Sequence, residues 1–210
     1  ESFAGAAKQY SSSIFVTLGT GVGGGIIIGG KLFEGNRSAG AEIGHMVIRM
    51  GGEKCTCGRK GCLEAYASAT ALIRQTRHAM EKNRESALWK IAPTLEEVDG
   101  KTAFDGMRAG DAAAERVVKN YISYLAEGLA NLANIFRPEA IVLGGGVCAE
   151  GEALLTPLRR RVNRLLYGGT KYAPVELLTA SLGNDAGLVG AAHFAQQKAE
   201  KSHSGQSRTE

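Results

Sequence analysis

The chain has 210 residues, of which 44% are hydrophobic, and its formal net charge at pH 7 is +4. This length and apolar content allow one large domain with a hydrophobic core. The small net charge, part of it in the arginines at 159, 160, 161 and 164 that fit a solvated helix face, argues against nucleic-acid binding. No apolar run is long enough to span a membrane. Four cysteines without a visible secretory signal favour the reducing cytoplasm.

We divide the chain into three parts. Residues 1–12 resemble the end of a helix and a linker, residues 13–197 form the domain, and residues 198–210 are a polar tail expected to be disordered. Because the first residues look like a helix that is cut mid-element, we expect the chain to be a piece of a longer protein.

The predicted elements begin with strands. The segment SIFVTL (13–18) has the composition of a buried strand, and GTGVGG follows it as a tight turn. The segment GIIIGGKLFEG then predicts a hairpin with Gly29 and Gly30 at its tip. A short strand is predicted at Met46–Arg49, and a loop that holds three cysteines comes after it.

Helices and strands alternate in the remainder. Helical patterns cover 64–82 and 152–166, short helices are expected between 83 and 110, and a last helix begins near Asn184. AIVLGGGV (140–147) predicts a strand that ends in a glycine turn, and another strand is predicted at 175–180. Strands dominate the first part of the chain, and helices alternate with strands in the rest. This order indicates an α/β domain with a mixed sheet.

A long helix is predicted from Asp111, as its N-cap, to Phe136, where Arg137-Pro138 ends it. Its apolar residues recur at steps of three and four: Val117, Tyr121, Leu125, Leu129 (or Gly128), Leu132 and Phe136. This stripe packs either in the hydrophobic core of its own chain or against a second copy in a homodimer.

Three of the four cysteines lie within eight residues, in CTCGRKGC, and a histidine lies ten positions before the first. One imidazole and three thiolates form a known tetrahedral set for structural zinc, here His45, Cys55, Cys57 and Cys62. Because protein ligands would fill all four positions, the zinc is expected to be structural. The alternatives are free buried thiols or a disulfide, which between Cys55 and Cys57 would be strained.

Two glutamates flank this cluster, Glu42 three residues before His45 and Glu64 two residues after Cys62. A metal clamp would bring both carboxylates toward one place, where paired carboxylates could accept hydrogen bonds from sugar hydroxyls. The alternative is that Glu64 caps the helix that follows it.

The segment LGTGVGGG (18–25) lies between two strands and lacks a following Lys-Ser or Lys-Thr, so it is not a P-loop. It resembles the phosphate-binding hairpins of the actin and sugar-kinase superfamily, in which backbone N–H groups and a threonine hydroxyl hold the phosphates of a nucleotide. Thr20 and the N–H groups of Gly21–Gly25 would take this role. The second turn, in LGGGV, suits backbone packed against adenosine and the α-phosphate. For either turn alone, simple chain reversal is the alternative.

Taken together, five segments resemble the ROK family (repressors, open reading frames, sugar kinases). They occur in the family's order between about Ile14 and Ala195, as LGTGVGGGIIIGGKLFEG, AGAEIGHM, CTCGRKGCLEAYAS, RPEAIVLGGGV and LGNDAGLVGAA. Within the family, EIGHM resembles the bacterial glucokinases more than the fructokinases.

The resemblance implies an α/β fold, the actin-like ATPase (ribonuclease H-like) large domain of a bilobed sugar kinase, with a zinc-binding loop. It implies phosphorylation of the 6-hydroxyl of glucose by ATP with Mg²⁺. Zinc is assigned to His45, Cys55, Cys57 and Cys62. Sugar contacts are assigned to Glu42, His45 and Glu64. Nucleotide contacts are assigned to Gly19, Thr20, Gly21, Val22, Gly23, Gly24, Gly25, Ile26, Gly144, Gly145 and Gly146.

The resemblance also places the catalytic aspartate upstream of Glu1, so we expect this chain alone to bind zinc without turning over glucose. A sugar-responsive transcriptional repressor of the same family is one alternative, which the intact GTGVGGG segment disfavours. A kinase for another sugar, such as N-acetylmannosamine or fructose, is a second. A purely structural zinc module is a third, and it would leave both glycine turns unexplained.

Overall fold

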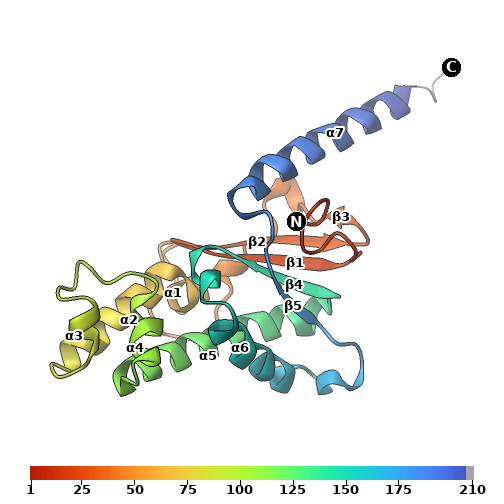
Figure 1. Cartoon of the computed structure of the whole chain (residues 1–210). Helices are drawn as coiled ribbons and strands as arrows, with labels where there is room; N and C mark the ends of the chain where they lie inside the picture. The colour runs from red at the N-terminus through yellow and green to blue at the C-terminus, as the bar shows by residue number, and fades with distance from the viewer. Residues whose placement is uncertain (207–210) are drawn as a thin grey trace.

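The structure, a computed structural model that describes residues 1–206, is built around a mixed sheet of five strands in the order β3-β2-β1-β4-β5 (Figure 1). β1 pairs antiparallel with β2 and parallel with β4. This confirms the mixed sheet predicted from the order of the elements. The strand bounds are β1 Ser13–Leu18, β2 Val22–Ile28, β3 Lys31–Leu32, β4 Ala140–Gly144 and β5 Glu176–Thr179.

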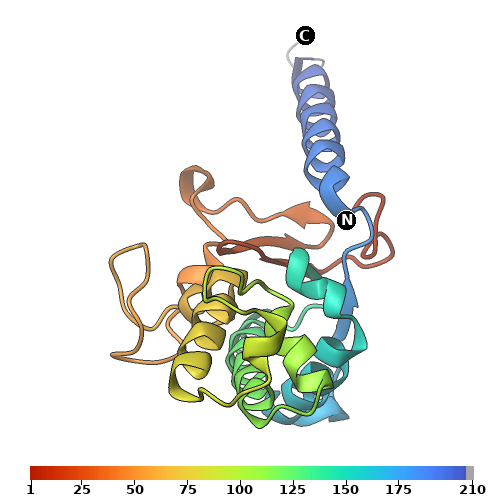
Figure 2. The ribbon, with the colours of Figure 1, turned by 60° about the vertical axis from the view of Figure 1, so that its left-hand side comes forward.

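Within residues 1–206, seven α-helices accompany the sheet. Figures 1 and 2 show α5 and α6 on one side of the sheet and α7 rising from the other side. The helix bounds are α1 Glu64–Ala67, α2 Ala69–Lys82, α3 Leu88–Ile91, α4 Thr102–Arg108, α5 Ala112–Phe136, α6 Glu152–Leu165 and α7 Ala186–Gln206. None of the helices in residues 1–206 combines the length and apolar content that crossing a bilayer requires.

The helix α5 begins and ends as its sequence predicts. The Asp111 carboxylate accepts a hydrogen bond from the backbone N–H of Ala114, and Arg137 ends the helix in the left-handed conformation. The predicted stripe is buried from Val117 to Leu132, whereas Phe136 is 36% exposed. The buried face packs into the main hydrophobic core together with residues of β1, β4 and α6, so the core of one chain accounts for the stripe.

Two predicted elements differ from the structure. Met46–Arg49 is not a strand. Of these residues only Val47 forms a β-bridge, an isolated one to Cys62, the last of the four predicted zinc ligands; we call these four residues the metal cluster. The helix predicted over 64–82 is broken at Ser68, whose extended backbone caps α2 through a hydrogen bond from the N–H of Ala71 to its hydroxyl. A serine competes with the helix by bonding the backbone locally, which explains the break.

The predicted ends of the chain also differ. Residues 2–9 form turns instead of the end of a helix, and the Glu1 carboxylate accepts hydrogen bonds from the backbone N–H groups of Ser181 and Leu182. At the other end α7 continues to Gln206, where a disordered tail from residue 198 was expected. Alanine, glutamine, lysine and glutamate favour helix in this segment. The last four residues of the predicted tail lie outside the described residues.

Candidate metal centre and glycine turns

The predicted zinc ligands come together. One ligand atom from each of His45, Cys55, Cys57 and Cys62 can be chosen so that all four lie within 4.8 Å of one another. The sulfurs of Cys57 and Cys62 are 3.7 Å apart, and Nδ1 of His45 is 3.5 Å from the sulfur of Cys55. With zinc bonds of about 2.3 Å to sulfur and about 2.0 Å to nitrogen, the edges of a tetrahedron are about 3.8 and 3.5 Å long. The four residues therefore fit a zinc ion, and the histidine would face it with Nδ1.

The thiols of the cluster are free, so the disulfide alternative is not formed. Burial, helped by the neighbouring thiols, raises the pKa of Cys62 to about 12. Exposed Cys57 has a lowered pKa because it accepts a hydrogen bond from the backbone N–H of Arg59. A metal ion would replace the protons of such thiols on binding.

The loop around the cluster is also held by contacts of residues that are not ligands. The hydroxyl of Tyr66 accepts a hydrogen bond of 2.6 Å from the backbone N–H of Glu53. The guanidinium of Arg59 donates to the carbonyl of His45. Gly61 has a φ of +85°, and a Cβ there would overlap the carbonyl oxygen of Arg49. The cluster is thus shaped by its surroundings as well as by its spacing.

Glu64 joins the metal cluster to the first glycine turn. Its carboxylate accepts hydrogen bonds from the N–H of Val22 (3.1 Å) and the hydroxyl of Thr56 (3.0 Å), and the Cys55 sulfur lies 3.6 Å away. Partial burial opposes its charge, but these donors outweigh that effect and lower the pKa of Glu64. Leu63, not Glu64, is the N-cap of α1, and Ser68 caps α2. Glu64 is the acidic residue of the first turn of α1, as the helix alternative expected, but its carboxylate bonds Val22 and Thr56 instead of the N-terminal backbone of that helix.

The segment that carries Glu42 and His45 lies against β2. A Cβ on Gly24 would overlap the side chain of Ile43, and a Cβ on Gly44 would overlap the carbonyl oxygen of Val22. Ile43 and Gly44 are buried by this contact, whereas Glu42 is exposed. Glycines on both sides therefore let the two backbones approach closely.

The first glycine turn is shorter than its sequence indicated. Only residues 19–21 turn the chain, and Gly23, Gly24 and Gly25 lie within β2, opposite Thr17, Val16 and Phe15. The N–H of Gly19 donates to the carbonyl of Gly21, and the carbonyl of Gly19 accepts from the N–H of Ala69 at the start of α2. The nucleotide-binding role of this segment stays a prediction.

The second glycine turn adjoins the first. Gly144 pairs with Thr17 across the parallel strands β4 and β1, and a Cβ on Gly145 would overlap the carbonyl oxygen of Leu18. Gly145 also has a φ of +95°, which favours glycine. Both turns thus follow the carboxyl ends of neighbouring parallel strands, where open α/β sheets bind ligands.

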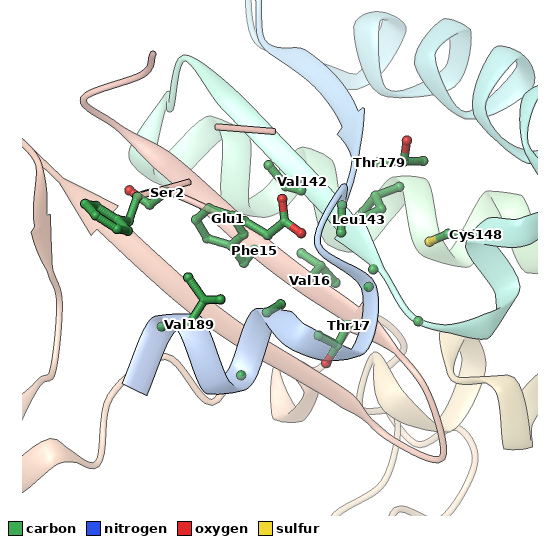
Figure 3. A pocket seen from close by; sticks show the side chains of 18 of the residues that line it. Glu1, Ser2, Phe15, Val16, Thr17, Val142, Leu143, Cys148, Thr179 and Val189 are labelled. Atoms are coloured by element: carbon green, nitrogen blue, oxygen red, sulfur yellow. The ribbon is translucent and has the colours of Figure 1, made fainter. Parts of the chain in front are cut away.

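A cavity of about 1290 Å³ opens beside the second turn, between the sheet and the first turns of α7. Gly144, Gly145 and Gly146 line it, and Figure 3 shows Phe15 and Thr17 of β1 on the same side of the sheet as Val189 of α7. Neither the four residues of the metal cluster nor any of residues 19–26 lines this cavity. Thr17 is a polar group of this cavity that sequence reasoning missed, because it lies inside a buried-strand pattern.

Comparison with known proteins agrees with this geometry. A glucokinase from Thermotoga maritima is 38% identical over 201 residues, which are 94% of this chain and 62% of that protein. A xylose repressor from Bacillus subtilis is 32% identical over 188 residues, 89% of this chain and 44% of that protein. The crystal structure of a ROK family glucokinase from Streptomyces griseus in complex with glucose and AMPPNP matches with a TM-score of 0.83 and 40% identity, over 91% of this chain and 62% of that chain.

The chain therefore spans about three fifths of the length of the glucokinases that it matches. Its sheet order and helices are those of the actin-like ATPase fold. The family model for the ROK family matches residues 1–198, and the chain belongs to this family.

Proposed function

We propose that a protein containing this chain, at the full length of the related glucokinases, transfers the γ-phosphoryl group of ATP to the 6-hydroxyl of glucose in the cytoplasm. The observation that carries the proposal is Glu64, whose carboxylate bonds both the cysteine loop, at Thr56, and the glycine turn, at Val22. A kinase must hold its sugar and its phosphates at a fixed separation, because phosphoryl transfer depends mainly on positioning and charge stabilisation.

On the sugar side, Glu42, His45 and Glu64 would contact the hydroxyls. The Nδ1 atom of His45 faces the cysteine sulfurs, so the other ring nitrogen, Nε2, would carry the proton and donate to a sugar hydroxyl. Zinc, when bound, supplies a fixed anchor for the histidine and the three thiolates. The loop between them would then orient Glu64 and the sugar, without any open metal position for chemistry.

On the phosphate side, the Thr20 hydroxyl and N–H groups of residues 19–26 would meet the phosphates, with Mg²⁺ neutralising their charge. The N–H of Val22 already donates to Glu64, and the N–H of Gly19 donates within its own turn. These two N–H groups therefore stabilise the conformation of the turn. Gly144–Gly146 would pack against the adenosine, because they line the cavity beside the strand ends.

A sugar-responsive repressor is the second candidate, favoured by the 32% identity with the xylose repressor. Such a protein could keep the zinc-held sugar site. The glucokinase likeness is closer in identity, at 38%, and covers more of that relative. A kinase for N-acetylmannosamine or fructose would share the phosphate side and differ in the contacts of the sugar pocket.

The test is an ATP-dependent assay of the full-length protein against glucose, fructose, mannose, N-acetylmannosamine and xylose. The expected result is the highest kcat/KM with glucose, and a loss of most glucose binding in Glu64→Gln with ATP binding retained. Sugar binding without any ADP release would favour the repressor. Turnover of another sugar with a higher kcat/KM than glucose would reject glucose as the substrate.

A further inference from the structure

A second cavity lies away from the metal cluster ligands and the glycine turns. It has a volume of about 890 Å³ and lies between α2, the first half of α5 and the loop residues 49–53, and its lining includes three aliphatic side chains and two tyrosines. Figure 2 shows the loop that contains these residues beside α2. Its size is in the range of small-molecule sites, and we call it the α2–α5 groove.

The α2–α5 groove carries an excess of positive charge. Its lining contains five side chains that are cationic at neutral pH and only two carboxylates, those of Glu53 and Glu81. Glu53 lies 4.0 Å from Arg74, with both side chains about half exposed, and Glu81 lies 3.9 Å from His78. Two carboxylates offset only two of the five positive charges, so the groove keeps an excess of positive charge. The five cations are Arg49, Arg74, Arg77, Lys82 and Arg116.

Three of these cations are held in place by single hydrogen bonds to the protein. Arg77 donates through Nε to the carbonyl of Leu95, Arg74 to the carbonyl of Ala65, and Arg49 to the hydroxyl of Tyr124. Each guanidinium keeps further N–H donors, since it has five. Among residues 1–206, no hydrogen bond or ion pair occupies the side chains of Lys82 and Arg116.

The positions of the cations indicate the shape of the ligand. Arg116 and Tyr124, the partner of Arg49, are eight residues apart on α5, which corresponds to about 12 Å along a helix. A single phosphate cannot contact both ends, whereas a molecule with separated phosphoryl groups can.

We propose that the α2–α5 groove binds a small metabolite that carries two or more phosphoryl groups. The site is separate from the proposed kinase site, because its cations are neither metal-cluster ligands nor residues of the glycine turns. Guanidinium and ammonium groups match phosphoryl oxygens through charge-assisted hydrogen bonds. Their exposure means that the affinity falls as the ionic strength rises.

The test is calorimetric titration of the zinc-loaded chain with sodium tripolyphosphate, at low and at physiological ionic strength. We expect saturable binding of one equivalent. The variant Lys82→Gln/Arg116→Gln should weaken it at least about tenfold, because two charge-assisted contacts are lost. Lys90→Gln/Arg160→Gln is the matched control, since it removes one lysine and one arginine charge from exposed sites outside the groove.

Three results would overturn the proposal. Equal weakening in the groove variant and the control would mean a general charge effect. Orthophosphate that binds as tightly as tripolyphosphate would contradict the spacing of the cations. A loss of binding in Thr20→Val, with none in the groove variant, would place the anion at the glycine turn. Retained circular dichroism in each variant shows that the measured loss is not unfolding.

Discussion

The two glycine turns resemble each other in the sequence but differ in what surrounds them. At the first, a Cβ on Gly21 would overlap the Glu64 carboxylate, a Cβ on Gly19 would meet no atom within 4 Å, and in the adjoining strand β2 a Cβ on Gly24 would overlap Ile43. In the second, Gly145 is constrained by Leu18 and by its positive φ, while a Cβ on Gly146 would meet no atom within 4 Å. The first turn is therefore packed against Glu64 at Gly21 and continues into a packed strand, whereas the second presents bare backbone to a cavity at Gly146.

This difference separates two uses of glycine. Around the first turn, glycine lets the segment 41–45 and Glu64 approach the strand, so the turn depends on the metal-cluster loop. At Gly146, glycine keeps space open where a ligand can lie against the backbone. Changes in the metal cluster should thus reach the first turn and leave the second unaffected, and each experiment below tests that separation.

The largest effect is expected from Cys57→Ala. Because Cys57 is an exposed, predicted zinc ligand, the substitution would remove a ligand without opening a core cavity. Zinc content, measured by elemental analysis, should fall from one equivalent to near zero. In the full-length protein the affinity for glucose should fall roughly a hundredfold, about 3 kcal/mol, and the affinity for ATP less than about threefold.

The matched control for Cys57→Ala is Cys148→Ala. This thiol lies outside the cluster beside the second turn, and burial raises its pKa to about 11, so it is protonated at neutral pH. Its loss should leave zinc content and glucose affinity unchanged. Equal weakening of glucose and ATP binding by Cys57→Ala would show that the two turns are not separate.

A smaller effect is expected from Gly24→Ala, compared with Gly25→Ala in the same strand. The Cβ of the first would overlap Ile43, whereas the Cβ of the second would lie 3.9 Å from Phe15, an ordinary contact. Urea denaturation should show a loss of about 1–3 kcal/mol for Gly24→Ala. Gly25→Ala should be neutral or stabilising by about 0.5 kcal/mol, since glycine weakens a strand. A similar loss for both would mean that the close approach to β2 is unimportant.

Local patterns in the sequence were sufficient to predict a large part of this fold. The apolar stripe and the Asp111 cap predicted α5, and short apolar runs predicted β1 and β4. Ligand chemistry and spacing predicted which four residues come together as a candidate zinc site. Each of these signals lies within about one element of chain, where periodicity and caps are reliable guides.

Contacts between distant segments could not be predicted in the same way. The N–H of Val22 and the carboxylate of Glu64 are 42 residues apart, so nothing near either residue indicates their hydrogen bond. The glycines of β2 were predicted to form a turn. Glycine is needed at Gly24 because the side chain of Ile43, from another segment, lies against it, and the local sequence does not indicate this contact. The break at Ser68 was hidden for a different reason, since the residues around it favour helix.

Asp111 lies away from both turns, so the pH dependence of the stability that it contributes serves as a reference for the whole domain. Partial burial opposes its charge, but donors at Ala114, Ser86 and Ala87 outweigh burial and lower the pKa of its carboxyl. A lowered folded-state pKa means that the stabilisation is complete above the unfolded value, about 3.9, and is lost as the pH falls through the lower folded value.

Asp111→Asn should therefore cost about 1 kcal/mol at neutral pH, because its amide group cannot accept all of these hydrogen bonds. The difference from the wild type, measured by urea denaturation, should shrink in acid below the unfolded pKa. In Asp111→Asn, the backbone amides that exchange only through global unfolding should exchange faster by the same factor at both glycine turns. A difference that persists unchanged in acid would show that the charge of Asp111 is not the stabilising feature.

The smallest effect on stability is expected from Gly146→Ala. Its φ is not in the left-handed region and its Cβ would meet open space, so the free energy of unfolding should change by less than about 0.5 kcal/mol. The added methyl group would nevertheless enter the cavity lined by Gly144–Gly146. If adenosine lies against this turn, ATP affinity in the full-length protein should fall while glucose affinity stays the same. That result would be the reverse of Cys57→Ala, and it would establish that the packed turn and the open turn serve different ligands. Unchanged ATP affinity would place the nucleotide elsewhere, and the openness of Gly146 would then need another explanation.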